Sequence, residues 1–153
     1  MMRILVSSCL LGEPVRYDGK SKPVSHQILQ KWQSQDRIIS FCPEVAGGLP
    51  IPRPAAEISH DGKVLTANSI DVTEAFDLGA QKALSLCLKN NVKFALLKEG
   101  SPSCGRNEIY DGSHQGNKIS GMGLTAQLLE KNDIKVFSEF QIEVLALLIN
   151  KRL

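Results

Sequence analysis

Three of the four cysteines follow segments whose composition is typical of buried strands. Cys9 comes after the apolar run at residues 3–7, Cys42 directly after the run at 37–41, and Cys104 a short loop after the run at 93–98. Each has Pro or Gly nearby, and these residue types fix the backbone and let a bulky ligand approach closely. Because the carboxyl ends of parallel strands meet at one edge of a sheet, we expect the three thiols to converge there.

Three converging thiolates can hold a metal in two ways. They can ligate zinc, with a fourth ligand from histidine or water. They can instead hold three irons of a [4Fe–4S] cluster and leave the fourth iron without a cysteine. The cysteine spacing does not separate these alternatives. His26, His60 and His114 lie in polar surroundings without ligand-like spacing, so we expect them to be solvated surface residues.

Cys87 has a different context from the other three cysteines. It continues a helical stripe of apolar residues formed by Phe76, Ala80, Ala83 and Leu84. Such a stripe faces a core, and a free cysteine in it behaves as a small buried hydrophobe. We therefore assign Cys87 to packing.

The elements that must position the cysteines alternate between strands and helices. A fourth strand is predicted at residues 134–137, and a turn at 60–63. Helices are predicted from Ser25 to about 33, from Asp71 or Thr73 to about 90, from Thr125 to about 132, and after a capping box of Ser138 and Gln141. This alternation predicts an α/β fold in which residues 1–153 form one domain. We expect a three-layer, Rossmann-like sandwich with a mostly parallel sheet and helices on both faces.

The segment at residues 42–54 is rich in proline. Its four prolines argue against a regular helix or a central strand. Since its flanks are apolar, we expect an ordered loop.

Composition limits the classes of function. The 153 residues carry 18 basic and 16 acidic side chains, a net charge of +2, which argues against extensive nucleic-acid binding. The longest purely apolar run, at 144–149, is far shorter than the ~20 residues of a membrane span. The start lacks the roughly 7–15 apolar residues of a secretory signal, so we expect a cytoplasmic protein. In that reducing compartment cysteines serve as metal ligands, catalytic groups or core residues more often than as disulfides.

At these motifs the sequence resembles the thiouracil desulfidase family, a bacterial family long catalogued as a domain of unknown function. The resemblance covers nearly the whole chain, and its two most specific segments contain Cys42-Pro43-Glu44 and residues 101–105, Ser-Pro-Ser-Cys-Gly. The matching segments are residues 7–12, 15–19, 42–54, 97–105, 109–112 and 121–126, the last leading into 136–139.

The resemblance implies a [4Fe–4S] cluster held by Cys9, Cys42 and Cys104. It also implies non-redox desulfuration of a small thiolated pyrimidine base, converting thiouracil to uracil and releasing hydrosulfide. Glu44 and Ser101 match the motif positions that assist catalysis. The chain departs from the pattern at Ser113-His114 and at Met122, where we expect an effect on the substrate pocket and none on the ligands.

This chemistry suits the residue types. A thiocarbonyl sulfur is soft and favours thiolate-ligated iron, which can act as a Lewis acid. Glu44 is expected to be the general base for a water, and Ser101 to orient the base or the water. The sequence holds no G-x-G-x-x-G and no Walker motif, which agrees with a reaction that needs no flavin, nicotinamide or adenosylmethionine.

Each of these residues also has a purely structural interpretation. Glu44 can be a structural partner of Arg53, and Ser101 a turn residue before Pro102. Arg16, Arg53, Lys98 and Glu99 can shape the pocket or form surface ion pairs. Two other functions also remain: a zinc or iron–sulfur binding module without catalysis, and a sulfurtransferase with a single nucleophilic cysteine.

Overall fold

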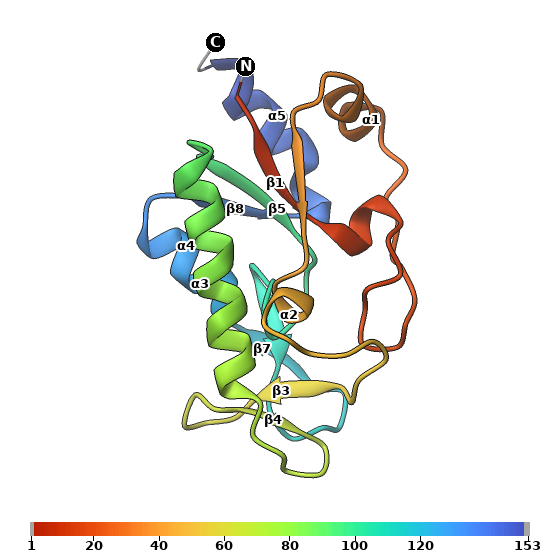
Figure 1. The fold of residues 1–153 in the computed structure, drawn as a ribbon, viewed down its shortest axis with the longest axis vertical. Helices are drawn as coiled ribbons and strands as arrows, with labels where there is room; N and C mark the ends of the chain where they lie inside the picture. The colour runs from red at the N-terminus through yellow and green to blue at the C-terminus, as the bar shows by residue number, and fades with distance from the viewer. Residues whose placement is uncertain (1, 152–153) are drawn as a thin grey trace.

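A parallel sheet of four strands forms the centre of the computed structural model, which describes residues 2–151 (Figure 1). Its strands, in spatial order, are β2 (Ile38–Phe41), β1 (Ile4–Ser7), β5 (Phe94–Leu97) and β8 (Lys135–Ser138). Ile4 of β1 is in register with Ile38 on one side and Phe94 on the other. The central strands β1 and β5 are buried throughout, which explains their continuous apolar runs. All four strands lie where the sequence predicts them.

Helices cover both faces of this sheet, so the predicted three-layer α/β sandwich is confirmed (Figure 1). On one face α1 (Gln27–Ser34) and α5 (Ile142–Lys151) pack against Ile4 and Val6. On the other face α3 (Thr73–Lys89) and α4 (Leu124–Lys131) pack against Leu5 and Ala95. Alternate residues of each strand therefore serve two separate cores. Cys87 lies in the second core and is fully buried, as the helical stripe predicts.

Three helix starts test the capping predictions. α1 is capped by His26, whose Nδ1 accepts the Ile28 N–H at 3.1 Å, so the prediction of Ser25 is wrong by one residue. α4 begins after Gly123, so the predicted start at Thr125 is one residue late. The hydroxyl of Thr125 does not cap the helix and forms a buried hydrogen bond with Ser103 instead. The predicted capping box at Ser138 is confirmed, and it opens a short 3₁₀ helix, η2 (Glu139–Gln141), that leads into α5.

Two small antiparallel hairpins, which the sequence did not predict, lie beyond the carboxyl ends of the central strands (Figure 1). One pairs β3 (Ala56–Ile58) with β4 (Val64–Thr66) across the predicted turn. The other pairs β6 (Glu108–Tyr110) with β7 (Lys118–Ser120) in the glycine-spaced stretch. Each strand has only three residues, too few to give a period-two pattern that stands out.

The proline-rich segment begins with a short helix, α2 (Pro43–Ala46). The expectation of no regular helix here is wrong for these four residues, because Pro43 occupies the first helical turn, where its fixed φ and missing N–H are tolerated. The rest of the segment is an ordered loop. The backbones of α2 and α3 touch: a Cβ on Gly79 would lie 2.0 Å from the Pro43 carbonyl oxygen, and one on Gly47 would lie 2.0 Å from that of Ala75.

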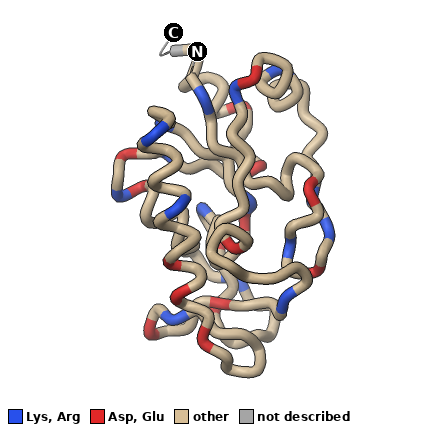
Figure 2. The backbone as a smooth tube through the Cα atoms, in the orientation of Figure 1, with Lys and Arg blue, Asp and Glu red and all other residues tan. Residues whose placement is uncertain are grey.

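Acidic and basic residues are interspersed over the chain rather than gathered by sign (Figure 2). Among the described residues, no helix is both long enough and apolar enough to cross a membrane.

Candidate functional site

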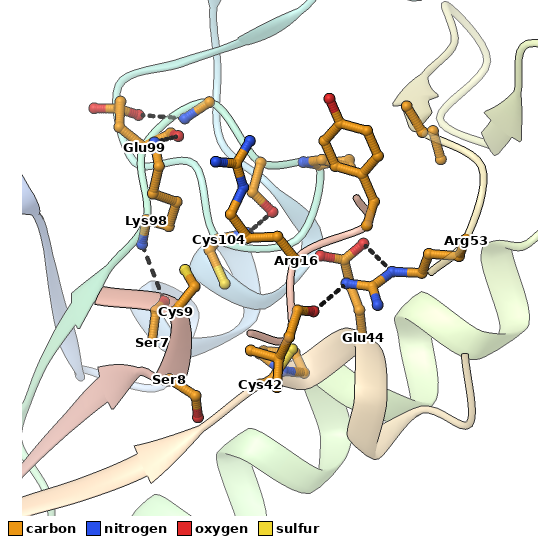
Figure 3. Close-up of a pocket in the computed structure, with 18 of the residues that line it drawn as sticks. Ser7, Ser8, Cys9, Arg16, Cys42, Glu44, Arg53, Lys98, Glu99 and Cys104 are labelled. Atoms are coloured by element: carbon orange, nitrogen blue, oxygen red, sulfur yellow. Dashed lines mark hydrogen bonds and ion pairs between the residues drawn. The ribbon is translucent and has the colours of Figure 1, made fainter. Parts of the chain in front are cut away.

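Cys9, Cys42 and Cys104 line one cavity of about 330 Å³ at the carboxyl edge of the central sheet (Figure 3). Cys9 lies in the 3₁₀ helix η1 (Ser8–Leu11) directly after β1, Cys42 immediately follows β2, and Cys104 lies in the loop after β5. All of them are free; Cys9 and Cys104 are buried and Cys42 is half-buried. The topology thus brings together the three thiols expected to converge, while the group they hold stays a prediction.

Burial makes these thiols hard to ionise on their own. It raises the pKa of Cys9 to about 11, an effect to which Cys42 adds and which Lys98 opposes. Burial also raises the pKa of Cys104, against a hydrogen bond from Ser7 that lowers it. The pKa of Cys42 is raised for the same main reason, although the Val45 N–H stabilises its thiolate. A free catalytic nucleophile needs a lowered pKa, whereas a bound metal deprotonates a thiol outright, so these cysteines suit metal ligation.

The donor set fits an iron–sulfur cluster. Within residues 2–151, no three His, Cys, Asp or Glu side chains come close enough together to ligate a single metal ion. The thiolates of cysteines are the soft ligands by which a protein holds a [4Fe–4S] cluster. Three cysteines from three strand ends would supply such ligands to one cavity.

Glu44 lies in the first turn of α2, two residues after Cys42, and lines the same cavity. Its Oε1 is 3.5 Å from Nε of Arg53, whose side chain is only 3% exposed. Two carbonyl oxygens fix that guanidinium, those of Val15 at 2.9 Å and Pro50 at 3.1 Å. Burial raises the pKa of Glu44, and the adjacent Arg53 opposes the rise. Glu44 therefore both pairs with Arg53 and faces the cavity, and the two interpretations of this residue are compatible.

Ser101 shapes the turn that presents Cys104. Its Oγ accepts the N–H groups of Ser103 at 3.0 Å and Cys104 at 3.1 Å, which is the turn role foreseen as an alternative. Ser101 also lines the cavity. Because both lone pairs of its oxygen are used, the hydroxyl proton is what it can offer to a bound molecule.

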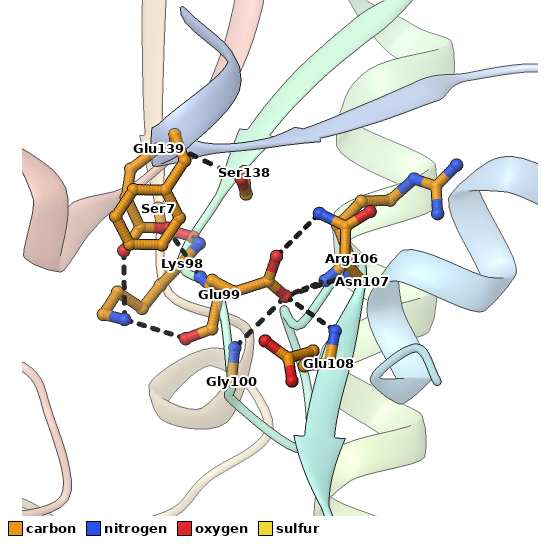
Figure 4. Close-up of polar contacts among 10 residues, drawn as sticks. Ser7, Lys98, Glu99, Gly100, Arg106, Asn107, Glu108, Ser138 and Glu139 are labelled. Atoms are coloured by element: carbon orange, nitrogen blue, oxygen red, sulfur yellow. Dashed lines mark hydrogen bonds and ion pairs between the residues drawn. The ribbon is translucent and has the colours of Figure 1, made fainter. Parts of the chain in front are cut away.

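Glu99 organises the loop between β5 and β6 (Figure 4). Its Oε1 accepts the N–H groups of Arg106 and Asn107 at 2.9 Å and of Glu108 at 3.1 Å, and its Oε2 accepts the Asn107 side chain at 2.7 Å. Burial alone raises the pKa of Glu99, but the hydrogen bonds from Asn107 and Glu108 outweigh it and hold the pKa below its ordinary value. Like the other pocket-shaping candidates Arg16, Arg53 and Lys98, it lines the cavity.

The hairpins supply wall residues that the sequence did not single out. Glu57 of β3 lines the cavity and accepts the N–H groups of Gly112 at 3.0 Å and His114 at 3.1 Å. Tyr110 and Lys118, from β6 and β7, line it as a pair, with the ammonium 5.5 Å from the ring centre. These residues were missed because the hairpins were missed.

Comparisons with known proteins cover nearly the whole chain. A family model described as 2-thiouracil desulfurase matches residues 4–141. An uncharacterized protein of Bacillus subtilis (strain 168), YbbK, is 40% identical over 148 residues, which are 91% of this chain and 97% of YbbK. A solved structure described as the [4Fe-4S]-dependent thiouracil desulfidase TudS is 51% identical, with a TM-score of 0.96 over 98% of this chain and 99% of that one.

Proposed function

Because the chain belongs to the 2-thiouracil desulfurase family, we propose that it is a [4Fe–4S]-dependent desulfidase of thiolated pyrimidine bases. The observation that carries this proposal is the convergence of Cys9, Cys42 and Cys104 with Glu44 on one cavity. The full-length similarity to a protein described as a [4Fe-4S]-dependent thiouracil desulfidase supports it. The reaction exchanges the thiocarbonyl sulfur for the oxygen of water and releases hydrosulfide.

Cys9, Cys42 and Cys104 would hold three of the four irons. When bound, the cluster supplies a Lewis-acidic iron without a cysteine, to which a soft thiocarbonyl sulfur is attracted and which makes the attached ring carbon more electrophilic. The chain itself then has to place a water against that carbon and remove its proton.

Glu44 is the group placed to take the proton. Its Oε1 faces Arg53, which leaves Oε2 to accept the proton of the attacking water. Burial makes the carboxylate a stronger base by raising its pKa, and Arg53 limits the rise. Its position two residues after Cys42, in the first turn of α2, keeps it beside the cysteine ligands.

Ser101 donates rather than accepts in this arrangement. Its oxygen is occupied by two backbone N–H groups, so its hydroxyl proton can bond the ring or the water and orient them. The carbon–sulfur bond then breaks, and the sulfur leaves with its electron pair as hydrosulfide. The water contributes oxygen to the base, its protons go to Glu44 and to the leaving sulfur, and no net electron is transferred.

The test is to purify the protein without oxygen and assay it. We expect about four irons and four sulfides per chain, and conversion of 2-thiouracil or 4-thiouracil to the oxo base with stoichiometric hydrosulfide. Replacing Cys9, Cys42 or Cys104 by Ser should remove iron and activity to a similar extent, whereas Cys87→Ala should keep both. Stoichiometric zinc, or activity that depends on only one of the three cysteines, would contradict the proposal.

A further inference from the structure

The fourth strand of the sheet brings a carboxylate, not a cysteine, to the edge that holds the site. Glu139 follows β8 and is 8% exposed at its side chain. Its Oε2 lies 3.0 Å from Nζ of Lys98, which follows the neighbouring strand β5. Ser138 capping and the motif at 136–139 were visible in the sequence, but this pairing was not, because it depends on the strand order.

The Lys98–Glu139 pair is held rigidly (Figure 4). The second oxygen of Glu139 accepts the Glu99 N–H at 2.7 Å. Nζ of Lys98 also donates to the Glu99 carbonyl at 2.8 Å, and the Lys98 N–H donates to Oγ of Ser7 at 3.0 Å. An ammonium and a carboxylate fixed by this many bonds keep their places beside the cavity.

One member of the pair shares the cavity with the cysteines. Lys98 lines the cavity together with Cys9, Cys42 and Cys104, whereas Glu139 does not line it. The two charges act on the cavity in opposite senses, because the carboxylate lies 3.0 Å from the ammonium. The ammonium thus favours negative charge in the cavity, and the carboxylate cancels part of that effect.

We propose that Glu139, acting through its ion pair with Lys98, holds down the electrostatic potential at the cysteine cavity and so keeps the reduction potential of the cluster low. This inference rests on the proposed function. A cluster potential depends on nearby charges and hydrogen bonds, and a positive charge stabilises the reduced form. A desulfidase that transfers no electrons needs its cluster in one oxidation state. When the charge of Lys98 is compensated by Glu139, the cluster is harder to reduce. Glu139 is therefore a positioning residue and does not touch the substrate.

The decisive variant is Glu139→Gln, which is nearly isosteric and can still accept the Glu99 N–H. It leaves the Lys98 ammonium uncompensated, so we expect the midpoint potential of the cluster to shift to a more positive value. The double variant Lys98→Met with Glu139→Gln removes both charges, and its potential should return to near that of the parent protein. The readout is an anaerobic redox titration followed by electron paramagnetic resonance.

Glu130→Gln is the matched control. Glu130 also accepts a backbone N–H, from Val136 at 2.6 Å, and also pairs with a cation, Arg106 at 3.9 Å, but it does not line the cavity. This variant should leave the midpoint potential unchanged. An unchanged midpoint potential in Glu139→Gln would overturn the proposal, and so would an equal shift in the single and double variants. If Glu139 had only a structural role, removing the Lys98 charge as well would not restore the potential.

A second measurement separates this proposal from the proposed function. If the protein carries no iron, the proposed function fails, and the cavity potential can still be read from the alkylation of Cys9 by anionic iodoacetate and neutral iodoacetamide. Both reagents react with the same thiolate, so the ratio of their rates reports the local potential. The rate with iodoacetate divided by the rate with iodoacetamide should rise in Glu139→Gln and return to the parent value in the double variant. A constant ratio contradicts the inference.

Discussion

Glu44, the general base that we propose, is subject to two opposing influences on its pKa. The cavity withdraws it from water, which raises its pKa, and Arg53 beside it stabilises the charged form. Arg53 is itself anchored on the carbonyls of Val15 and Pro50, so the ion pair joins α2 to two loops. The pair thus gives a carboxylate that is basic without being free to move.

Glu44→Gln should remove the proton acceptor and keep the shape of the side chain. We expect kcat/KM for thiouracil to fall by roughly 10²–10⁴-fold, the usual range for losing a general base, with iron and sulfide content unchanged. Glu74→Gln, at an exposed position of α3, is the control and should retain full activity. Equal turnover in both variants would show that Glu44 is only a partner of Arg53.

The lowered pKa of Glu99 gives a prediction of how the stability of the fold depends on pH. Its folded-state pKa lies below the ordinary value of 4.5, so the stabilisation is present above that value and is lost as the pH falls through the folded-state pKa. Urea titrations between pH 7 and pH 3 should show the free energy of unfolding of the parent protein decreasing below about pH 4.5. Glu99→Gln should be less stable at pH 7 and should lose less on acidification. Parallel curves for the two proteins would contradict this role.

Among the elements, α2 owes its position to backbone contact with α3. Gly79 and Gly47 let the two helices approach until carbonyl oxygens occupy the space of a side chain. This contact sets where Cys42 and Glu44 lie, since both belong to the start of α2. A glycine in the middle of a long helix, which costs helix stability, is thereby explained by the site it positions.

Gly79→Ala should displace α2, because the new Cβ would lie 2.0 Å from the Pro43 carbonyl oxygen. We expect a loss of about 1–3 kcal/mol in the free energy of unfolding together with reduced iron content. Ser85→Ala, on an exposed position of the same helix, is the control and should change neither quantity by much. If Gly79→Ala bound iron normally and were as stable as the parent, close packing would not be what positions Cys42.

The elements differ in how far the sequence predicts them. The four central strands and α3 follow from long apolar runs and stripes, and the cysteines follow from their places after the strands. The hairpins and α2 are too short for periodicity to reveal them, and Pro43 argues against a helix unless it is known to stand in the first turn. Glu57 reaches the cavity wall, and Glu139 reaches Lys98 and Glu99, through contacts between distant segments, which no local pattern contains.

For the whole molecule, stability and chemistry reside in different places. The two hydrophobic cores lie on the faces of the sheet, and the cysteine cavity lies at its edge. Cys9 belongs to one of these cores and Cys104 to the other, but the large apolar side chains in both cores need no metal to be buried. The fold should therefore be independent of the cluster.

Removing iron with a chelator under anaerobic conditions should abolish activity and leave the chain folded. We expect an unchanged far-ultraviolet circular dichroism spectrum and a cooperative thermal transition. Its Tm should fall, because a ligand that binds only the native state stabilises it, by roughly 2–4 °C for each kcal/mol of stabilisation lost. Loss of the cooperative transition would show that the cluster is part of the core structure.

The two hairpins have a consequence for how this protein can change. Within the described residues, no member of either core cluster comes from β3, β4, β6 or β7, yet these strands supply Glu57, Tyr110 and Lys118 to the cavity wall. Mutations there can remodel the wall while the sheet, the cysteines and Glu44 stay in place. The hairpins are thus the region in which a mutant library should yield new substrate preferences at the smallest cost in folding yield.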